Sequence, residues 1–247
     1  MIPLKSEKDL ETLRRSGAIL AKIMKRLHGL IKSGISTAEI DSLAEKLVAQ
    51  ENAIPAFKGY RGFPATVCAS INEEIVHGIP GERRLKEGDI ISLDLGINYQ
   101  GYFSDAAFTL GVGKIDPKIK KLIEVTRKAL SEGIKEAKAE NNLSDISYRI
   151  QNYVEKNGFS VVRQFVGHGI GRNLHEEPEI PNFGRPHEGP VLQKGMVFAI
   201  EPMVNMGTWE SEIMDNGWTA VTKDRLPSAH FEHTVAITDR GPEILTN

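Results

Sequence analysis

The first fifty residues have the pattern of two amphipathic helices. Apolar side chains recur at helical spacing behind Ser6-Glu-Lys-Asp9, a capping box whose two ends satisfy each other's backbone amides. The repeat continues up to Ser33-Gly34, where we expect the first helix to end. A second capping box, Ser36-Thr-Ala-Glu39, predicts another amphipathic helix, with Ile40 and Leu47 on its apolar face.

Short strands are predicted between residues 52 and 110, where glycine and proline separate brief apolar runs. Ile90–Ile97 and Tyr102–Leu110 flank a turn at Asn98-Tyr-Gln-Gly101, which indicates a β-hairpin. If Asn98 pairs with Gly101, Asp94 lies directly opposite Asp105 on one face of the hairpin. Two carboxylates about 5 Å apart repel each other by roughly 3 kcal/mol at an effective dielectric near 20. A shared proton or a divalent cation would relieve this repulsion, whereas two solvent-facing aspartates would need neither.

The order of elements then repeats. Asp116-Pro117 predicts the start of a long helix through Ala137, and a fourth helix is expected from near Ser144 to Asn157-Gly158. Strand character resumes at 161–166 and 196–201. The first helices of the two series start 110 residues apart, the second ones 108, and Asp94 and Glu201 are 107 apart. A chance alternation is about as compatible with this pattern, but the offset of the acids favours two similar halves, about 1–112 and 113–247, within a single catalytic domain 1–247.

Composition narrows the class of protein. Basic and acidic residues nearly balance, 31 against 33 in 247 residues, which gives no indication of a nucleic-acid or membrane partner. The single cysteine, Cys68, excludes an internal disulfide framework and fits a reducing compartment. No apolar leader or stretch of 18 apolar residues occurs, so we expect a cytoplasmic protein.

Acidic residues also stand in other apolar runs. Glu201 closes Met196–Ile200, and Glu232 precedes Val235–Ile237, positions that suit a carboxylate only if it is paired or liganded. A salt bridge explains any one of these acids. Four carboxylates together with one histidine instead form an oxygen-rich set for two divalent ions, and the lack of cysteine ligands favours Mn, Fe, Co or catalytic Zn.

The histidines differ in their surroundings. His77 lies in a segment bounded by glycine and proline, where functional residues concentrate. His168 and His175 are seven apart around a glycine-rich turn, so one can bind metal while the other faces substrate. His28 is expected to be a surface or core residue, and spacing leaves three others undecided: His187, His230 and His233.

Together these motifs resemble those of the type I methionine aminopeptidases. The resemblance rests on five stretches that span nearly the whole chain: Asn72–Pro80, Asp94 with Asp105, Gly167–Pro178, Ile200–Met203 and Phe231–Thr234. It implies the α+β, pseudo-two-fold pita-bread fold, a curved, mostly antiparallel sheet covered by two helix pairs.

The resemblance also implies roles for individual residues. Two metal ions would be held by the following ligands: Asp94, Asp105, His168, Glu201 and Glu232. His77 would contact the leaving nitrogen of the scissile peptide, His175 would stabilise the oxyanion, and Glu201 would carry the proton. The methionine pocket would be lined by Tyr60, Phe63, Cys68, Leu174 and Trp218. Departures from the family pattern, which affect pocket shape and substrate range, occur at Arg61, Leu174 and Ala106-Ala107.

The implied activity is metal-dependent removal of the initiator methionine from N-terminal methionyl peptides and nascent chains with a small second residue. A monomer is expected, without nucleic-acid or membrane partners, and ribosome association remains open. One rival is a proline-directed aminopeptidase or dipeptidase of the same fold, which uses the same ligands but usually carries an additional amino-terminal domain. The other is a non-catalytic pita-bread peptide-binding module, which would generally have lost ligands.

Overall fold

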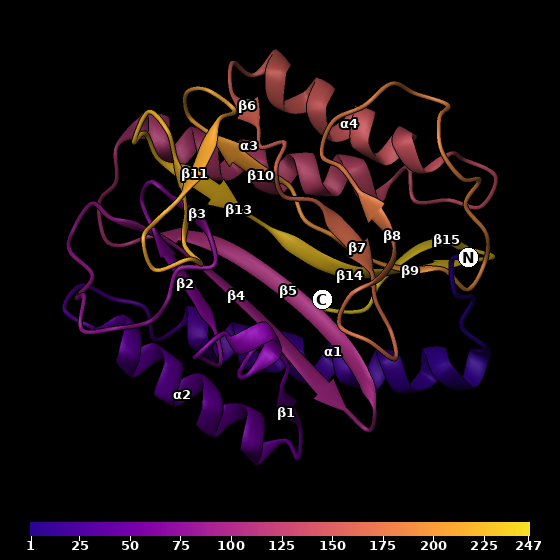
Figure 1. The fold of residues 1–247 in the computed structure, drawn as a ribbon, viewed down its shortest axis with the longest axis horizontal. Helices are drawn as coiled ribbons and strands as arrows, with labels where there is room; N and C mark the ends of the chain where they lie inside the picture. The colour runs from indigo at the N-terminus through magenta and orange to yellow at the C-terminus, as the bar shows by residue number, and fades with distance from the viewer.

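A computed structural model describes all residues 1–247. Four helices form two pairs, of which the first opens the chain and the second begins near its midpoint (Figure 1). Their bounds are α1 Glu7–His28, α2 Thr37–Gln50, α3 Pro117–Ile134 and α4 Leu143–Lys156. No helix is both long enough and apolar enough to span a lipid bilayer.

Capping side chains set where three of the helices begin. Both predicted capping boxes are present, with Ser6 before α1 and Ser36 before α2. The side chain of Asp116 caps α3 by accepting a hydrogen bond from Lys118 N. Two predicted ends are wrong, because α1 stops at His28 rather than near Ser33 and α3 at Ile134 rather than Ala137.

All strand pairs of the main sheet are antiparallel. Its spatial order is β1-β4-β5-β14-β9-β7-β8, and β2 and β15 pair in addition with β4 and β14. The bounds are β1 Ile54–Pro55, β2 Cys68–Ile71, β4 Ile90–Tyr99, β5 Tyr102–Gly111, β7 Gly167–Gly169, β8 Glu176–Ile180, β9 Val197–Ile200, β14 Glu232–Thr238 and β15 Gly241–Ile244.

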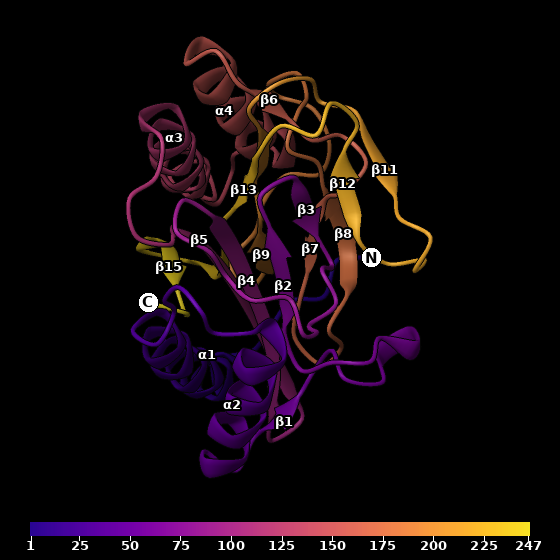
Figure 2. The same cartoon turned by 90° about the vertical axis from the view of Figure 1, so that its left-hand side faces the viewer.

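Two smaller sheets complete the fold, ordered β13-β10-β6 and β11-β12-β3. Their strands are β3 Glu74–Val76, β6 Ser160–Val161, β10 Met203–Asn205, β11 Ser211–Ile213, β12 Ala220–Thr222 and β13 Ser228–His230, and a 3-10 turn covers Tyr60–Gly62. The strand predicted at 161–166 is therefore wrong beyond Val161. The helices lie on one side of the main sheet and β11 and β12 on the other (Figure 2).

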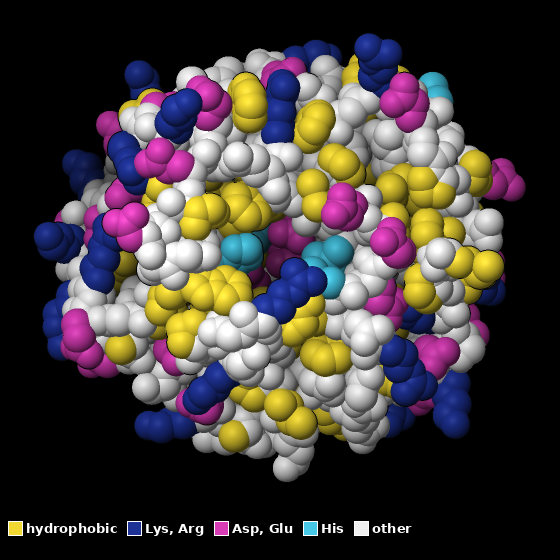
Figure 3. Space-filling model, in the orientation of Figure 1, with side chains coloured by type: hydrophobic (Ala, Val, Ile, Leu, Met, Phe, Trp, Pro, Cys, Tyr) yellow, Lys and Arg dark blue, Asp and Glu magenta, His cyan; other side chains and the backbone are white.

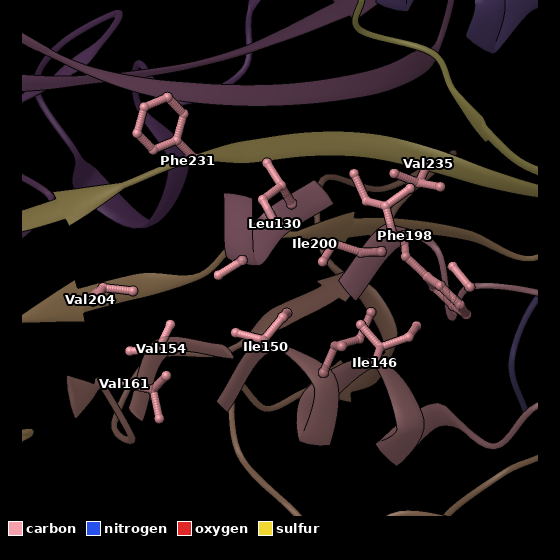
Figure 4. Packing of buried hydrophobic residues seen from close by; sticks show 14 of the residues in the cluster. Leu130, Ile146, Ile150, Val154, Val161, Phe198, Ile200, Val204, Phe231 and Val235 are labelled. Atoms are coloured by element: carbon pink, nitrogen blue, oxygen red, sulfur yellow. The ribbon is translucent and has the colours of Figure 1, made fainter. Parts of the chain in front are cut away.

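Buried apolar side chains fix each helix pair to the sheet. The largest cluster joins α3 and α4 to the central strands, and Leu130, Ile146 and Ile150 point toward Phe198 and Val235 (Figure 4). A second cluster of 19 residues, from Leu20 to Val112, does the same for α1, α2 and β4. The predicted α+β pita-bread architecture is confirmed, while the boundary between halves near residue 112 stays a prediction.

The hairpin of β4 and β5 has the predicted strands but a different register. Tyr99 pairs with Tyr102, so the turn consists of Gln100 and Gly101, both with positive φ, 52° and 80°. Such a two-residue turn matches the twist of the strands, and glycine suits its second position. The predicted pairing of Asp94 with Asp105 is wrong, because Asp94 lies opposite Ala107. A shift of two residues preserves the face, so both carboxylates still point the same way.

Candidate metal and substrate site

Two strands of the hairpin supply the first pair of carboxylates. Asp105 is buried on β5, opposite Gly96, and Asp94 is half-buried on β4. The backbone of Asp105 is fixed by Thr234, whose hydroxyl accepts from Asp105 N at 2.9 Å and donates to Asp105 O at 2.8 Å. Oδ1 of Asp94 is buried without a hydrogen-bond partner. A buried carboxylate oxygen with no partner indicates a place for a cation.

The second pair comes from the neighbouring strands. Glu201 directly follows β9 and Glu232 opens β14, which lies between β5 and β9 in the sheet. Glu232 pairs with Ala107 in register, so its side chain comes close to the hairpin acids. Its Oε1 atom is buried and also lacks a partner. The order of the strands in the sheet therefore brings the four acids, from separate parts of the sequence, into one cluster.

His168 enters this cluster from β7, between two glycines. A Cβ atom on Gly167 would lie 2.4 Å from Ala199 O, and one on Gly169 would lie 2.2 Å from Glu177 O, so larger residues do not fit. Nδ1 of His168 donates to Gly169 O at 2.9 Å, since a carbonyl oxygen only accepts. The lone pair therefore belongs to Nε2, which faces Glu201 Oε1 at 3.6 Å.

The charges of this cluster are not balanced by protein groups. Burial raises the pKa of all four carboxyls, and repulsion from neighbouring carboxylates adds to the rise for Asp105, Glu201 and Glu232. Neither lysine nor arginine forms an ion pair with any of them. Ligand atoms of Asp105, His168 and Glu232 lie within 4.8 Å of one another. These oxygens and one imidazole nitrogen fit hard or borderline divalent cations, which supply the missing positive charge.

The acids lie at the bottom of a cavity of about 170 Å³, which opens in the centre of the face shown in Figure 3. All five predicted ligands line it, as do all five predicted pocket residues: Tyr60, Phe63, Cys68, Leu174 and Trp218. Phe57, which was not predicted, also lines it, and so does Arg61, which was expected to affect pocket shape. Phe63 and Trp218 pack edge to face with ring centroids 5.2 Å apart. One side of the cavity is thus apolar and the other is acidic.

Two histidines flank the opening. His77 packs edge to face against Phe165 at 5.5 Å and Trp218 at 6.4 Å, and burial lowers its pKa to about 4. His175 lies beside His168, with ring centroids 4.2 Å apart, and its Nδ1 is 2.9 Å from the hydroxyl of Tyr60. Both imidazoles can therefore offer an N–H group to a substrate between them.

The spacing of the histidines leaves the role of His230 undecided, and the structure places this residue beside Glu201. It is fully buried at the end of β13, both ring nitrogens lack partners, and Nε2 lies 3.7 Å from Glu201 Oε2. Its position two residues before Glu232 was the available signal. The other histidines without a predicted role, His28, His187 and His233, do not line the cavity.

Comparison with known proteins places this geometry in a family. The model of metallopeptidase family M24 matches residues 11–239. The methionine aminopeptidase of Clostridium perfringens is 52% identical over 246 residues, which cover 100% of this chain and 99% of that protein. The crystal structure of methionine aminopeptidase from Rickettsia prowazekii superposes with a TM-score of 0.99 at 40% identity, and each chain is covered completely.

A prolidase from Pyrococcus horikoshii shares the fold, with a TM-score of 0.81 at 24% identity, but this chain covers only 63% of it. Full coverage and high identity are found with methionine aminopeptidases instead. Membership implies the use of a divalent metal by a hydrolase. The chain belongs to metallopeptidase family M24 and, within it, to the methionine aminopeptidases.

Proposed function

We propose that this chain removes the N-terminal methionine from peptides and nascent proteins whose second residue is small. One observation carries the proposal. Buried carboxylate oxygens without partners, Asp94 Oδ1 and Glu232 Oε1, lie in the same cavity as an apolar pocket formed by Phe63 and Trp218. Such a site combines metal ligands with space for an unbranched apolar side chain such as that of methionine.

The proposed centre holds two divalent ions, drawn from Co, Mn, Fe or Zn. Its ligands are Asp94, Asp105, His168, Glu201 and Glu232. When bound, divalent metal supplies a water of lowered pKa and a Lewis acid for the substrate carbonyl. Four carboxylates balance the charge of two such ions, which supports the proposed number.

The protein groups around the metal have separate tasks in this proposal. Glu201, itself one of the proposed ligands, would accept a proton from the attacking water and pass it to the leaving amine, since its carboxylate lies beside the position of that water. His175 donates an N–H to the developing oxyanion, a contact whose loss costs about 3 kcal/mol in comparable sites. His77 donates to the leaving nitrogen. Burial keeps the pKa of His77 near 4, so its ring is neutral and able to do this at pH 7.

The apolar side of the cavity would select methionine. Tyr60, Phe63, Cys68, Leu174 and Trp218 would surround its side chain, and the free amine would point toward the acids. Leu174 stands where an aromatic residue is frequent in the family, which gives the pocket an aliphatic wall. Ala106-Ala107 replaces hydroxyl residues after the second aspartate, and we expect these positions to affect substrate range as well.

The test compares three peptides after reconstitution with each metal: Met-Ala-Ser, a peptide with a bulky second residue, and an Xaa-Pro peptide. We expect turnover of the first only. Preferred cleavage of the Xaa-Pro peptide would establish the proline-directed rival, and absence of turnover with metal bound would establish the binding module. Asp105→Ala and Glu201→Ala should abolish hydrolysis and reduce metal content. Asp215→Ala removes an exposed acid outside the cavity and is the matched control.

We further propose that the enzyme acts in the cytoplasm as a monomer, on nascent chains, without nucleic-acid or membrane partners. The balanced charge and the single buried cysteine support this setting. Ribosome association would follow from the need to reach nascent chains. Sedimentation of cell lysate through a sucrose cushion, with and without puromycin, tests that association directly.

A further inference from the structure

We propose that Arg61 makes this site prefer substrates with an acidic side chain at the third or fourth position. The inference rests on the proposed removal of methionine and names the class of peptide that the same site favours. Its starting point is the position of Arg61, which lines the same cavity as the acids.

Arg61 is the one lysine or arginine among the residues that line the cavity. It is exposed and forms no ion pair with any carboxylate of the protein. Lys58, three residues earlier in the chain, instead pairs with Glu45 at 2.6 Å. Arg61 therefore offers the free positive charge at this opening.

The backbone holds Arg61 toward the cavity. Its φ of 49° lies in the left-handed region, inside the turn Tyr60–Gly62, and its guanidinium carbon lies 5.5 Å from the centroid of the Tyr60 ring. Tyr60 in turn contacts Nδ1 of His175 through its hydroxyl at 2.9 Å. The charge is thus placed next to the histidine that flanks the substrate path.

Geometry decides which part of the substrate meets Arg61. An aminopeptidase binds nothing before the first residue, so methionine fills the apolar side of the cavity and the chain continues outward through the opening. The second residue lies between His77 and His175. An extended peptide advances about 3.3 Å per residue, so the third and fourth residues pass the edge of the opening, within reach of a long arginine side chain.

The expected size of the preference is modest because both partners are solvated. Exposed ion pairs change a binding equilibrium by a small factor, about threefold here. Salt at high concentration should remove most of this factor, since the Debye length falls to roughly 3 Å at 1 M.

The experiment uses isosteric pairs, Met-Ala-Asp-Ser with Met-Ala-Asn-Ser and Met-Ala-Ser-Asp with Met-Ala-Ser-Asn, all amidated at the C-terminus. We expect a kcat/KM ratio of Asp to Asn peptide of about three in at least one pair at low salt, falling toward one in 1 M NaCl. Arg61→Gln should lower the ratio to one or below, and Arg61→Glu should lower it further. Arg61→Lys should retain it, and so should Lys58→Gln, which removes the same charge outside the cavity.

A ratio that is the same in wild type, Arg61→Gln and Arg61→Glu would overturn the inference while leaving the proposed function intact, because the Asn peptides would still be cleaved. Loss of the ratio in Lys58→Gln would also overturn it, since general surface charge would then be the cause. A wild-type enzyme that cleaves none of the four peptides would overturn the proposed function and this inference with it. Because the Asp and Asn peptides are compared with the same preparation of each variant, their kcat/KM ratio does not depend on the fraction of protein that is folded. Thermal melting checks that each variant folds.

Discussion

Nε2 of His230 lies 3.7 Å from Oε2 of Glu201, inside the core. The other oxygen of Glu201 faces His168 Nε2 at 3.6 Å, so its carboxylate is held between two imidazoles. Burial lowers the pKa of His230 to about 3, which leaves it neutral with one N–H to donate. A shift on the order of half an ångström would bring that N–H into hydrogen-bond range of Glu201. His230 is thus placed to orient the carboxylate proposed to carry the proton.

Replacement of His230 should therefore impair turnover more than binding. A hydrogen bond to a charged group contributes roughly 1.5–3 kcal/mol, so His230→Leu should lower kcat by about tenfold or more with little change in KM. His230→Gln, which keeps a donor of similar reach, should retain most of kcat. Steady-state kinetics on Met-Ala-Ser gives both constants. Equal kcat in the Leu and Gln variants would show that the donor has no role.

Thr234 fixes the backbone of Asp105 through two buried hydrogen bonds, one donated and one accepted by its hydroxyl. Thr234→Val leaves the N–H and C=O of Asp105 without these partners at similar side-chain volume, which should lower the free energy of unfolding by about 2 kcal/mol. Thr234→Ser keeps the hydroxyl and should be milder. Urea denaturation in the presence of chelator measures the effect without any contribution from metal. Equal loss in both variants would contradict the argument.

The sequence was sufficient to predict features that depend on residues close together in the chain. The capping boxes at Ser6 and Ser36 specify their helix starts because each depends on residues three positions apart. The end of α1 at His28 is not of this kind, since Leu30 continues the apolar pattern but is exposed. Helix length there follows packing against the sheet, which the sequence pattern does not contain.

The identity of the site residues could be predicted from the sequence, but their arrangement in space could not. Motif spacing placed Asp94 and Asp105 on one face, yet their register depended on the turn type at Gln100-Gly101, and the expected direct pairing was wrong by two residues. His230 escaped prediction because its importance comes from burial beside Glu201, 29 positions earlier in the chain. Such contacts arise only when β13 and β9 are brought together.

A stability prediction away from the site concerns Glu132, which joins α3 to α4. Its carboxylate accepts from Lys135 Nζ and from Arg149 at 2.6 Å each, and these bonds lower its pKa to about 2. Because the folded pKa lies below the ordinary value of 4.5, the stabilisation is present above about pH 4.5 and is lost as the pH falls toward 2.

Glu132→Gln should accordingly lower the free energy of unfolding by about 1 kcal/mol at pH 7, a value reduced for solvent screening, and the difference from wild type should shrink at pH 3. Glu124→Gln removes an exposed carboxylate of the same helix that has no such partners and serves as the control. Urea denaturation at both pH values provides the measurement. A difference that stays constant from pH 7 to pH 3 would assign the effect to packing rather than charge.

The acid cluster itself predicts how metal and pH act together on stability. In the metal-free protein burial raises the pKa of Asp94, Asp105, Glu201 and Glu232, so folding favours their protonated forms. Stability is then fully present below their ordinary values near pH 4 and is lost as pH rises through the raised ones. Divalent metal binds the ionised carboxylates and offsets this loss.

We therefore expect the melting temperature of chelator-treated protein to fall between pH 5.5 and pH 8, whereas that of protein loaded with Mn²⁺ should not. The gap between the two curves should widen with pH. Asp105→Asn removes one of the repelling charges, so the melting temperature of the chelator-treated variant should depend less on pH. Asp215→Asn changes an exposed acid outside the cavity and should leave the pH dependence of wild type unchanged. Parallel curves with and without metal would mean that other groups already neutralise the four carboxylates in the metal-free protein. Only carboxylates without such partners make the stabilisation by metal grow as the pH rises.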